Sequence, residues 1–383
     1  MTVEVVERVR RRLAEGGRAP SRAELAALVR AESGALVPDH QVLELVRQAE
    51  SELAGAGPLE PLLRQPGVTD VLVNGPDQIW MDRGRGLERA AVRFADEDAV
   101  RRLAQRLAAS AGRRLDDARP WVDAALPDGT RLHAVLSPVA TDGTCLSLRC
   151  FRPRGFTARQ LVEVGTLTDE SARLVDAVVR ARLAFLITGG TGSGKTTLLG
   201  TMLGIVDRAE RLVLVEDSAE LRPDHHHVVR LSARSPNVEG AGEITLRDLV
   251  RQALRMRPDR LVVGEVRGAE VVEMLTAMNT GHDGGAGTVH ANSAVELPAR
   301  LEALGGLAGL GRHALHSQLA AAVQVALHLR RGRDGRRVLA EIGVLRRTHD
   351  LVTVTPAWRY DSGPAAAWPQ LSALLAPVLR RSG

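Results

Sequence analysis

Lysine is almost missing from this chain of 383 residues: of its 51 lysines and arginines, only Lys195 is a lysine. Aromatic residues make up 2% of the sequence, so its cores must be built from leucine, valine and alanine. This scarcity disfavours a protein that binds nucleic acid by stacking bases on aromatic rings. The net charge is only +5. We therefore expect a solvated, arginine-rich surface, and the small net charge disfavours a nucleic-acid partner.

Cysteines and long apolar runs are also scarce. The two cysteines, Cys145 and Cys150, are spaced neither as metal ligands nor as a redox pair, which predicts two reduced thiols. No stretch approaches the roughly 18 apolar residues of a membrane span, and the arginines at 10–12 are not followed by the apolar core of an export signal. We expect a cytoplasmic protein whose membrane contact is peripheral or made through a partner.

The hydrophobic pattern divides the chain into four parts. The first repeats apolar residues at helical spacing and predicts three short amphipathic helices, at 6–13, 25–29 and 42–53. The second mixes alternating strand patterns with one helix, which indicates a smaller mixed α/β domain. After a linker, strands and helices alternate as a parallel α/β sheet requires. The parts are a helical segment (1–56), the smaller α/β domain (57–151), the linker (152–160) and the larger α/β domain (161–383).

The larger domain is expected to end in helices and a hairpin. Its alanine-rich stretch at 317–329 predicts a helix, and Asp334 and Gly335 predict the turn of a hairpin. The strands expected before them are 184–188, 212–215, 228–231, 261–263 and 286–290.

A phosphate-binding loop follows the first of these strands directly. Its glycines let successive backbone N–H groups converge on phosphate oxygens, and the helix that follows adds partial positive charge. A chance glycine-rich turn is disfavoured because the only lysine stands at the motif's lysine position, and a dinucleotide-binding turn is disfavoured because its glycine spacing fails. Lys195 is expected to reach the β- and γ-phosphates of ATP, and Thr196 to bind Mg²⁺. The loop consists of Gly189, Gly190, Thr191, Gly192, Ser193, Gly194, Lys195, Thr196 and Thr197.

Two later strands end in carboxylates. Glu216 ends the strand at 212–215, and it is a candidate for orienting or deprotonating the attacking water. Glu265 ends the strand at 261–263, after Gly264 at the kind of position where the usual second nucleotide motif has an aspartate. We therefore expect the metal role to fall to Glu265. A solvated strand end is the better interpretation for either acid alone, but both together with a phosphate loop favour function.

Two histidines, His282 and His290, lie in a glycine-rich segment at 281–293. Their imidazoles are suited to sensing the γ-phosphate, because hydrolysis removes charge beside them. A flexible loop with incidental histidines explains the segment equally well. The residues themselves leave both interpretations open.

Together these motifs resemble the type II/IV secretion-system ATPases, and within them the CpaF or TadA branch, which assembles tight-adherence (Flp) pili. The resemblance implies a sensor-like N-terminal α/β domain, a RecA-like P-loop motor domain, and a hexameric ring with nucleotide between the two domains. It also implies coupling to an inner-membrane platform protein, at the inner face of the cytoplasmic membrane. The segments that carry it are the phosphate loop, 215–221, 247–260, 263–268, 279–283 and 288–293.

The resemblance also implies residue roles. Glu216 falls in the family's aspartate box, Glu265 in its atypical Walker B motif, and His282 and His290 in its histidine box. Arginines of the N-terminal domain reach the γ-phosphate in the family, and Arg131 and Arg149 lie on the matching strands. One departure is the segment 284–287, which is richer in glycine than is usual for the family.

The primary hypothesis is thus a hexameric motor that hydrolyses ATP with Mg²⁺ to power assembly of a Flp/Tad-type pilus or secretion across the inner membrane. A RecA-like nucleic-acid translocase, acting in conjugal transfer, is the alternative from another class; it would bind DNA in a strongly salt-dependent way. A small-molecule kinase is a third possibility. Nothing in the chain suggests the acceptor pocket or lid that a kinase needs.

Overall fold

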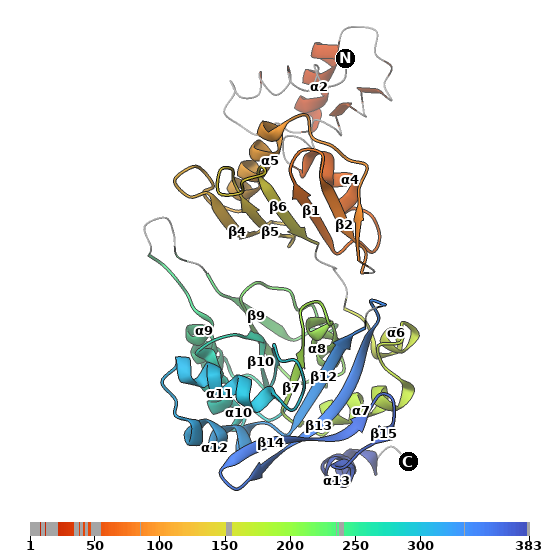
Figure 1. The fold of residues 1–383 in the computed structure, drawn as a ribbon, viewed down its shortest axis with the longest axis vertical. Coiled ribbons are helices and arrows are strands. Elements are labelled where there is room, and N and C mark those ends of the chain that lie inside the picture. Colours follow the sequence, from red (N-terminus) through yellow and green to blue (C-terminus); the bar gives the residue numbers. More distant parts are fainter. Residues whose placement is uncertain are drawn as a thin grey trace. The chain divides into compact units, whose positions relative to one another are not determined.

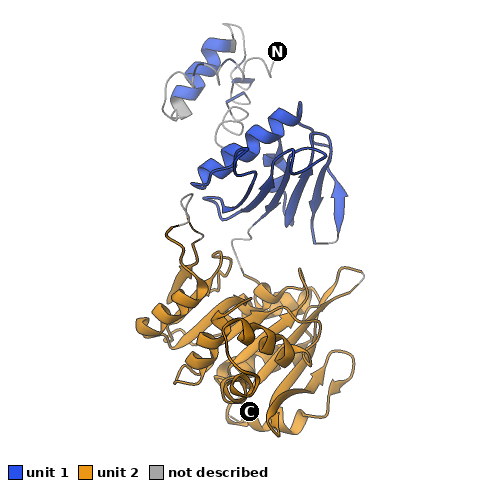
Figure 2. Ribbon diagram, turned by 60° about the vertical axis from the view of Figure 1, so that its left-hand side comes forward, with its two compact units in different colours: residues 1–151 blue, residues 152–383 orange. Residues whose placement is uncertain are grey.

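The computed structural model of the protein describes residues 22–33, 55–84, 86–150, 155–234, 241–332 and 334–380, together with residues 8, 12, 38, 41–42, 45–46 and 236. The chain forms two compact units, residues 1–151 (unit 1) and 152–383 (unit 2) (Figure 2). Of the three helices expected in residues 1–56, the second is α2 (Arg22–Ser33). The first and third lie largely outside the described residues.

Unit 1 is built on an antiparallel sheet. In its described part, six strands follow the order β3-β2-β1-β6-β5-β4. Helix α5 (Glu97–Ser110) packs Val100, Leu103 and Leu107 into the core that the sheet's apolar face supplies. The helix begins at Asp96, whose side chain accepts a hydrogen bond from the backbone N–H of Ala99 at 2.7 Å. The other elements are η1 (Gly57–Leu59), α4 (Glu60–Leu63), β1 (Asp70–Asn74), β2 (Ile79–Asp82), β3 (Leu87–Arg89), β4 (Trp121–Ala125), β5 (Arg131–Val135) and β6 (Cys145–Arg149).

Unit 2 contains a larger mixed sheet. Its described strands follow the order β15-β14-β13-β12-β7-β11-β10-β8-β9, and those from β12 to β9 are parallel. The strands are β7 (Phe185–Gly189), β8 (Leu212–Glu216), β9 (Val228–Ser232), β10 (Arg260–Val266), β11 (Ala286–Val289), β12 (Val325–Arg331), β13 (Arg337–Thr348), β14 (Leu351–Arg359) and β15 (Gly363–Pro364). The helices are α6 (Ala158–Glu163), α7 (Asp169–Arg180), α8 (Lys195–Gly204), α9 (Leu246–Ala253), η2 (Leu254–Met256), α10 (Glu270–Met278), α11 (Leu297–Leu307), α12 (Arg312–Ala322) and α13 (Trp368–Leu379).

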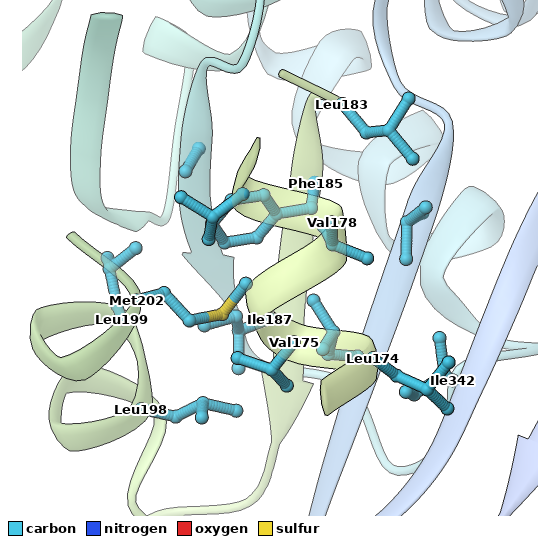
Figure 3. Close-up of a cluster of buried hydrophobic side chains, with 14 of the residues drawn as sticks. Leu174, Val175, Val178, Leu183, Phe185, Ile187, Leu198, Leu199, Met202 and Ile342 are labelled. Carbon is cyan, nitrogen blue, oxygen red and sulfur yellow. The ribbon is translucent and has the colours of Figure 1, made fainter. Parts of the chain in front are cut away.

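Helices cover both faces of the parallel strands (Figure 1). Alternate residues of β7 face opposite sides: Phe185 and Ile187 join the core under α7, α8 and α13, whereas Leu186 joins the core under α9 to α12. Figure 3 shows Phe185 and Ile187 among side chains of α7 and α8, including Val178 and Met202. Burial on both faces explains why these strands read as continuous apolar runs.

The helix expected at 317–329 is wrong in its second half. Helix α12 ends at Ala322, and β12 begins at Val325 as a central strand beside β7. The exchange occurs at Gln324, whose side-chain oxygen accepts a hydrogen bond from the N–H of Ala184 at 2.8 Å while its own N–H donates to the Ala184 carbonyl at 3.0 Å. Pairing with a strand distant in sequence therefore overrides the helical preference of the local segment.

Across the part of the chain that the structure describes, none of the helices combines the length and the apolar character needed to span a bilayer.

Candidate active site

The phosphate loop lies between a fully buried strand and a helix. Strand β7 ends at Gly189, and α8 starts at Lys195 with Gly194 as its left-handed N-cap. Gly189 itself has φ 149, and a Cβ there would lie 2.5 Å from the Leu329 carbonyl oxygen of β12 and 2.6 Å from Ser193 Oγ. Only glycine can therefore take the first position of the loop. The hydroxyl of Ser193 is buried and, among the described residues, has no hydrogen-bond partner.

Lys195 is folded into the loop. Its side chain is only 7% exposed, and Nζ donates to the carbonyl oxygens of Gly189 at 3.0 Å and Gly190 at 3.1 Å. Burial lowers the pKa of Lys195, because a low-dielectric surrounding disfavours the ammonium form. An ammonium held by two weak neutral acceptors is well placed to exchange them for anionic oxygens.

Three strand ends meet at this lysine. Nζ of Lys195, after β7, lies 3.2 Å from Nε2 of His290, which follows β11. The same Nε2 lies 2.7 Å from Oε1 of Glu265, at the end of β10. Burial and the nearby charge of Lys195 lower the pKa of His290, so a neutral ring is favoured near pH 7. Its single Nε2 then either donates to Glu265 or accepts from Lys195.

Glu265 is also held by an arginine that the sequence analysis missed. Nε of Arg267 donates to Oε2 of Glu265 at 2.8 Å, and Nη2 contacts the same oxygen. The guanidinium also lies 3.6 Å from Asp217, just past the end of β8. Arg267 lies just past the end of β10, two residues after Glu265, and this short spacing was the available signal.

Glu216 occupies a different environment. It is 4% exposed, and its Oε1 accepts hydrogen bonds from the N–H groups of Glu220 at 3.0 Å and Leu221 at 2.9 Å. Its Oε2 is buried and has no partner among the described residues. Burial raises the pKa of Glu216 to about 7 against the two N–H donors, which lower it. The described hydrogen bonds and ion pairs do not link Glu216 to Lys195 or Glu265.

Gly264 has a steric reason to be glycine. It lies on β10 beside the end of β8, and a Cβ at this position would lie 2.7 Å from Cγ of Glu216. An aspartate, as in the usual second nucleotide motif, would collide with that buried side chain. The strand therefore presents its carboxylate one residue later, at Glu265.

The remaining predicted residues are described each within its own unit. His282 contacts the Ala277 carbonyl oxygen through Nδ1 at 3.2 Å, and the described contacts do not connect it with Lys195. Thr196 lies in the first turn of α8. In unit 1, Arg131 of β5 and Arg149 of β6 are directly opposite each other, and Arg149 pairs with Asp70 at 3.2 Å.

Comparison with known proteins assigns the family. Residues 52–344 match the type II/IV secretion system protein family. A Mycobacterium tuberculosis H37Rv protein, Rv3659c, whose name assigns it provisionally to conjugal transfer, is 61% identical over 334 residues, which are 86% of this chain and 95% of that protein. The conjugal transfer protein TrbB of Rhizobium radiobacter is 30% identical over 277 residues, 71% of this chain and 82% of TrbB.

Solved structures agree on the fold. The pilus retraction motor PilT is 20% identical, with a TM-score of 0.52, over 82% of this chain and 84% of PilT. The ATPase DotB of Legionella pneumophila is 22% identical, with a TM-score of 0.51, over 79% of this chain and 81% of DotB. The fold and the loop thus define a RecA-like P-loop ATPase. The chain belongs to the type II/IV secretion system protein family.

Proposed function

We propose that this ATPase hydrolyses ATP with Mg²⁺ at the loop 189–197 and drives a pilus-assembly or secretion machine of the tight-adherence type. The proposal includes a homohexamer at the inner face of the cytoplasmic membrane, working on an inner-membrane platform protein. The observation that carries the chemistry is a chain of contacts beside the loop. Nζ of Lys195 lies 3.2 Å from Nε2 of His290, which lies 2.7 Å from Oε1 of Glu265. The partners and the pilus branch rest on the family and on the motifs quoted above.

The residues of the loop fit a magnesium nucleotide. Lys195 supplies a cation whose present acceptors are backbone carbonyls, and it can turn to phosphate oxygens at little cost. Thr196 supplies a hydroxyl at the start of α8 and Glu265 a carboxylate, and Mg²⁺ prefers a few such oxygen ligands together with phosphate and water. The bound Mg-ATP would supply the transferable phosphoryl group and the charge that these side chains stabilise.

His290 is the proposed sensor of this exchange. While Lys195 is held by the loop carbonyls, its charge beside His290 disfavours protonation of the ring. When Lys195 turns to a phosphate, that repulsion falls, and Nε2 is left to donate to Glu265. A change at the phosphates is thus passed to the carboxylate at the end of β10. His282, Arg131 and Arg149 keep their proposed roles in phosphate sensing on the resemblance alone.

Glu216 is the proposed general base. A carboxyl with a pKa of about 7 is matched to proton transfer near neutral pH. Glu265, held by Arg267 and His290, is the proposed metal ligand. The two acids are thus given separate tasks by their surroundings, which is a common arrangement for pairs of catalytic carboxylates.

Two substitutions test the proposal. Glu265→Gln should bind ADP and ATP while losing about 10²-fold or more of its steady-state phosphate release, because the developing charge and the metal lose their carboxylate. Lys195→Ala should lose nucleotide binding as well, since the phosphates lose their cation. Calorimetric titration separates binding from turnover. Wild-type turnover in either variant would contradict the proposal.

A nucleic-acid translocase remains the second candidate, because relatives carry conjugal transfer names. DNA-stimulated hydrolysis, with DNA binding that weakens steeply as salt rises, would favour it. Hydrolysis unaffected by DNA, together with a hexamer in the presence of ATP by sedimentation, would favour the pilus or secretion motor.

A further inference from the structure

Two arginines from the C-terminal hairpin lie against the phosphate loop. Arg331 ends β12 and Arg337 begins β13. Nε of Arg337 donates to the carbonyl oxygen of Gly192 at 2.8 Å, and its Cδ lies 3.5 Å from the position that a Cβ of Gly194 would take. Nη1 of Arg331 lies 3.5 Å from the corresponding position at Gly192. Both side chains therefore reach the middle of the loop, about 140 residues earlier in sequence.

The hairpin places these arginines on one face. Arg331 and Arg337 are directly opposite each other in the β12–β13 pair, so their side chains project to the same side of the sheet. Both guanidinium groups therefore carry their positive charge on the side of the hairpin that meets the loop. The neighbouring Arg330 is opposite Val338 and therefore projects to the other side.

The order of strands decides which side of a nucleotide these arginines would meet. Strand β7 lies between β11 and β12. His290 and Glu265 approach the loop from the β11 side, which is where the proposed function puts phosphoryl transfer. Arg331 and Arg337 approach it from the β12 side, away from Glu265. A polyphosphate that follows the loop would therefore have Glu265 near its γ end and the arginines beside the phosphates at the nucleoside end.

We propose that Arg331 and Arg337 form a second cationic wall of the nucleotide site, which binds the phosphates at the nucleoside end. Arg337 is the main contributor, because its Nε–H donates to the Gly192 carbonyl oxygen and thereby holds the guanidinium at the loop. Arg331 is more exposed and contributes less. The inference rests on the nucleotide site proposed above and adds to it a contact with the part of the polyphosphate that does not react.

The test is ADP binding measured by calorimetry with Mg²⁺, alongside GDP. Arg337→Ala should weaken the binding of ADP and of GDP by the same factor, roughly tenfold, as expected for the loss of a partly exposed charge-assisted contact. Arg331→Ala should have a smaller effect of the same kind. The matched controls are Arg330→Ala and Arg336→Ala on the same hairpin. Arg330 projects to the other side of the sheet, and Arg336 lies beside Gly165 rather than beside the loop. Both should bind ADP with nearly wild-type affinity.

Two further variants separate charge from loop shape. Arg337→Lys keeps the charge and should recover part of the ADP affinity that Arg337→Ala loses. Arg337→Gln can still donate to the Gly192 carbonyl oxygen but has no charge, and it should recover none of that affinity. The deficit of Arg337→Ala should also shrink as salt rises from roughly 0.05 to 0.5 M, because salt screens exposed charges.

Several results would overturn the inference. Recovery by Gln but not by Lys would assign Arg337 a purely structural role. An altered preference between ADP and GDP would assign it to the base rather than the phosphates. Unchanged ADP binding by Arg337→Ala would remove the wall while leaving the proposed function intact, whereas a wild-type protein that fails to bind ADP would remove both.

Discussion

The substitution Glu216→Gln tests the raised pKa of the Glu216 carboxyl. The measured quantity is the free energy of unfolding, so no activity assay is needed. The pKa of this carboxyl rises from an ordinary 4.5 to about 7 in the folded protein because burial disfavours its charge. Between these two values the unfolded chain has lost the proton while the folded chain keeps it. Stability therefore falls as pH rises through this window and levels off above pH 7.

The size of the effect follows from the difference between the two pKa values. About 2.5 pH units at roughly 1.4 kcal/mol each correspond to about 3–4 kcal/mol of destabilisation above pH 7, most of which develops between pH 5 and 7. Glutamine has a similar shape, and its oxygen can still accept from the N–H groups of Glu220 and Leu221, but it does not ionise. The free energy of unfolding of Glu216→Gln minus that of the wild type should consequently increase as pH rises from 5 to 8.

The assay is urea unfolding of both proteins at several pH values from 5 to 8, followed by circular dichroism. Taking the difference between variant and wild type removes the titration of all other groups. A constant offset is expected from the buried amide, so only the slope is diagnostic. Glu163→Gln, an exposed carboxylate paired with Arg159, is the control. A difference for Glu216→Gln that stays flat from pH 5 to 8 would refute the reasoning.

Three other substitutions test the packing of unit 2 by thermal and urea unfolding. Gly264→Ala places a Cβ 2.7 Å from Cγ of Glu216 and should cost about 1–3 kcal/mol, as overpacking does; an unchanged midpoint would mean that β10 can shift freely. Gly306→Ala, in α11 with nothing within 4 Å of the added Cβ, should instead stabilise by about 0.5–1 kcal/mol. Glu210→Ala removes the carboxylate that Arg260, at 1% exposure, contacts at 2.8 and 3.0 Å, and should cost about 3–5 kcal/mol. A loss under 1 kcal/mol there would show that water reaches Arg260.

The strands and the loop of unit 2 were accessible from sequence because their signals are local. An apolar run followed by glycines and Lys195 fixes β7, the loop and α8 together, and carboxylates at strand ends mark Glu216 and Glu265. Parallel topology then brings such strand ends to one edge. Topology does not determine which side chains touch, and no sequence signal separates His290, which contacts Lys195, from His282, which contacts Ala277.

Contacts between segments that are distant in sequence could not be predicted from the sequence. The hydrogen bond from Arg337 to Gly192 spans 145 residues, and eight positions from 330 to 337 include several arginines with nothing in the sequence to distinguish them. The side of the sheet to which each arginine projects depends on the register of β12 with β13. That register could not be predicted while β12 was itself expected to be part of a helix.

The end of β10 explains how a carboxylate can serve the site without an aspartate at position 264. The pairing of β10 with β11 changes register between Val263 and Val266, and such irregularities re-aim side chains beside active sites. Thr288 of β11 fixes the irregular segment, because its Oγ1 donates to the Gly264 carbonyl oxygen at 2.7 Å. Glu265 thereby meets His290 at 2.7 Å, while Gly264 leaves room for Glu216. One irregular strand end thus accommodates both acids, each in a different environment.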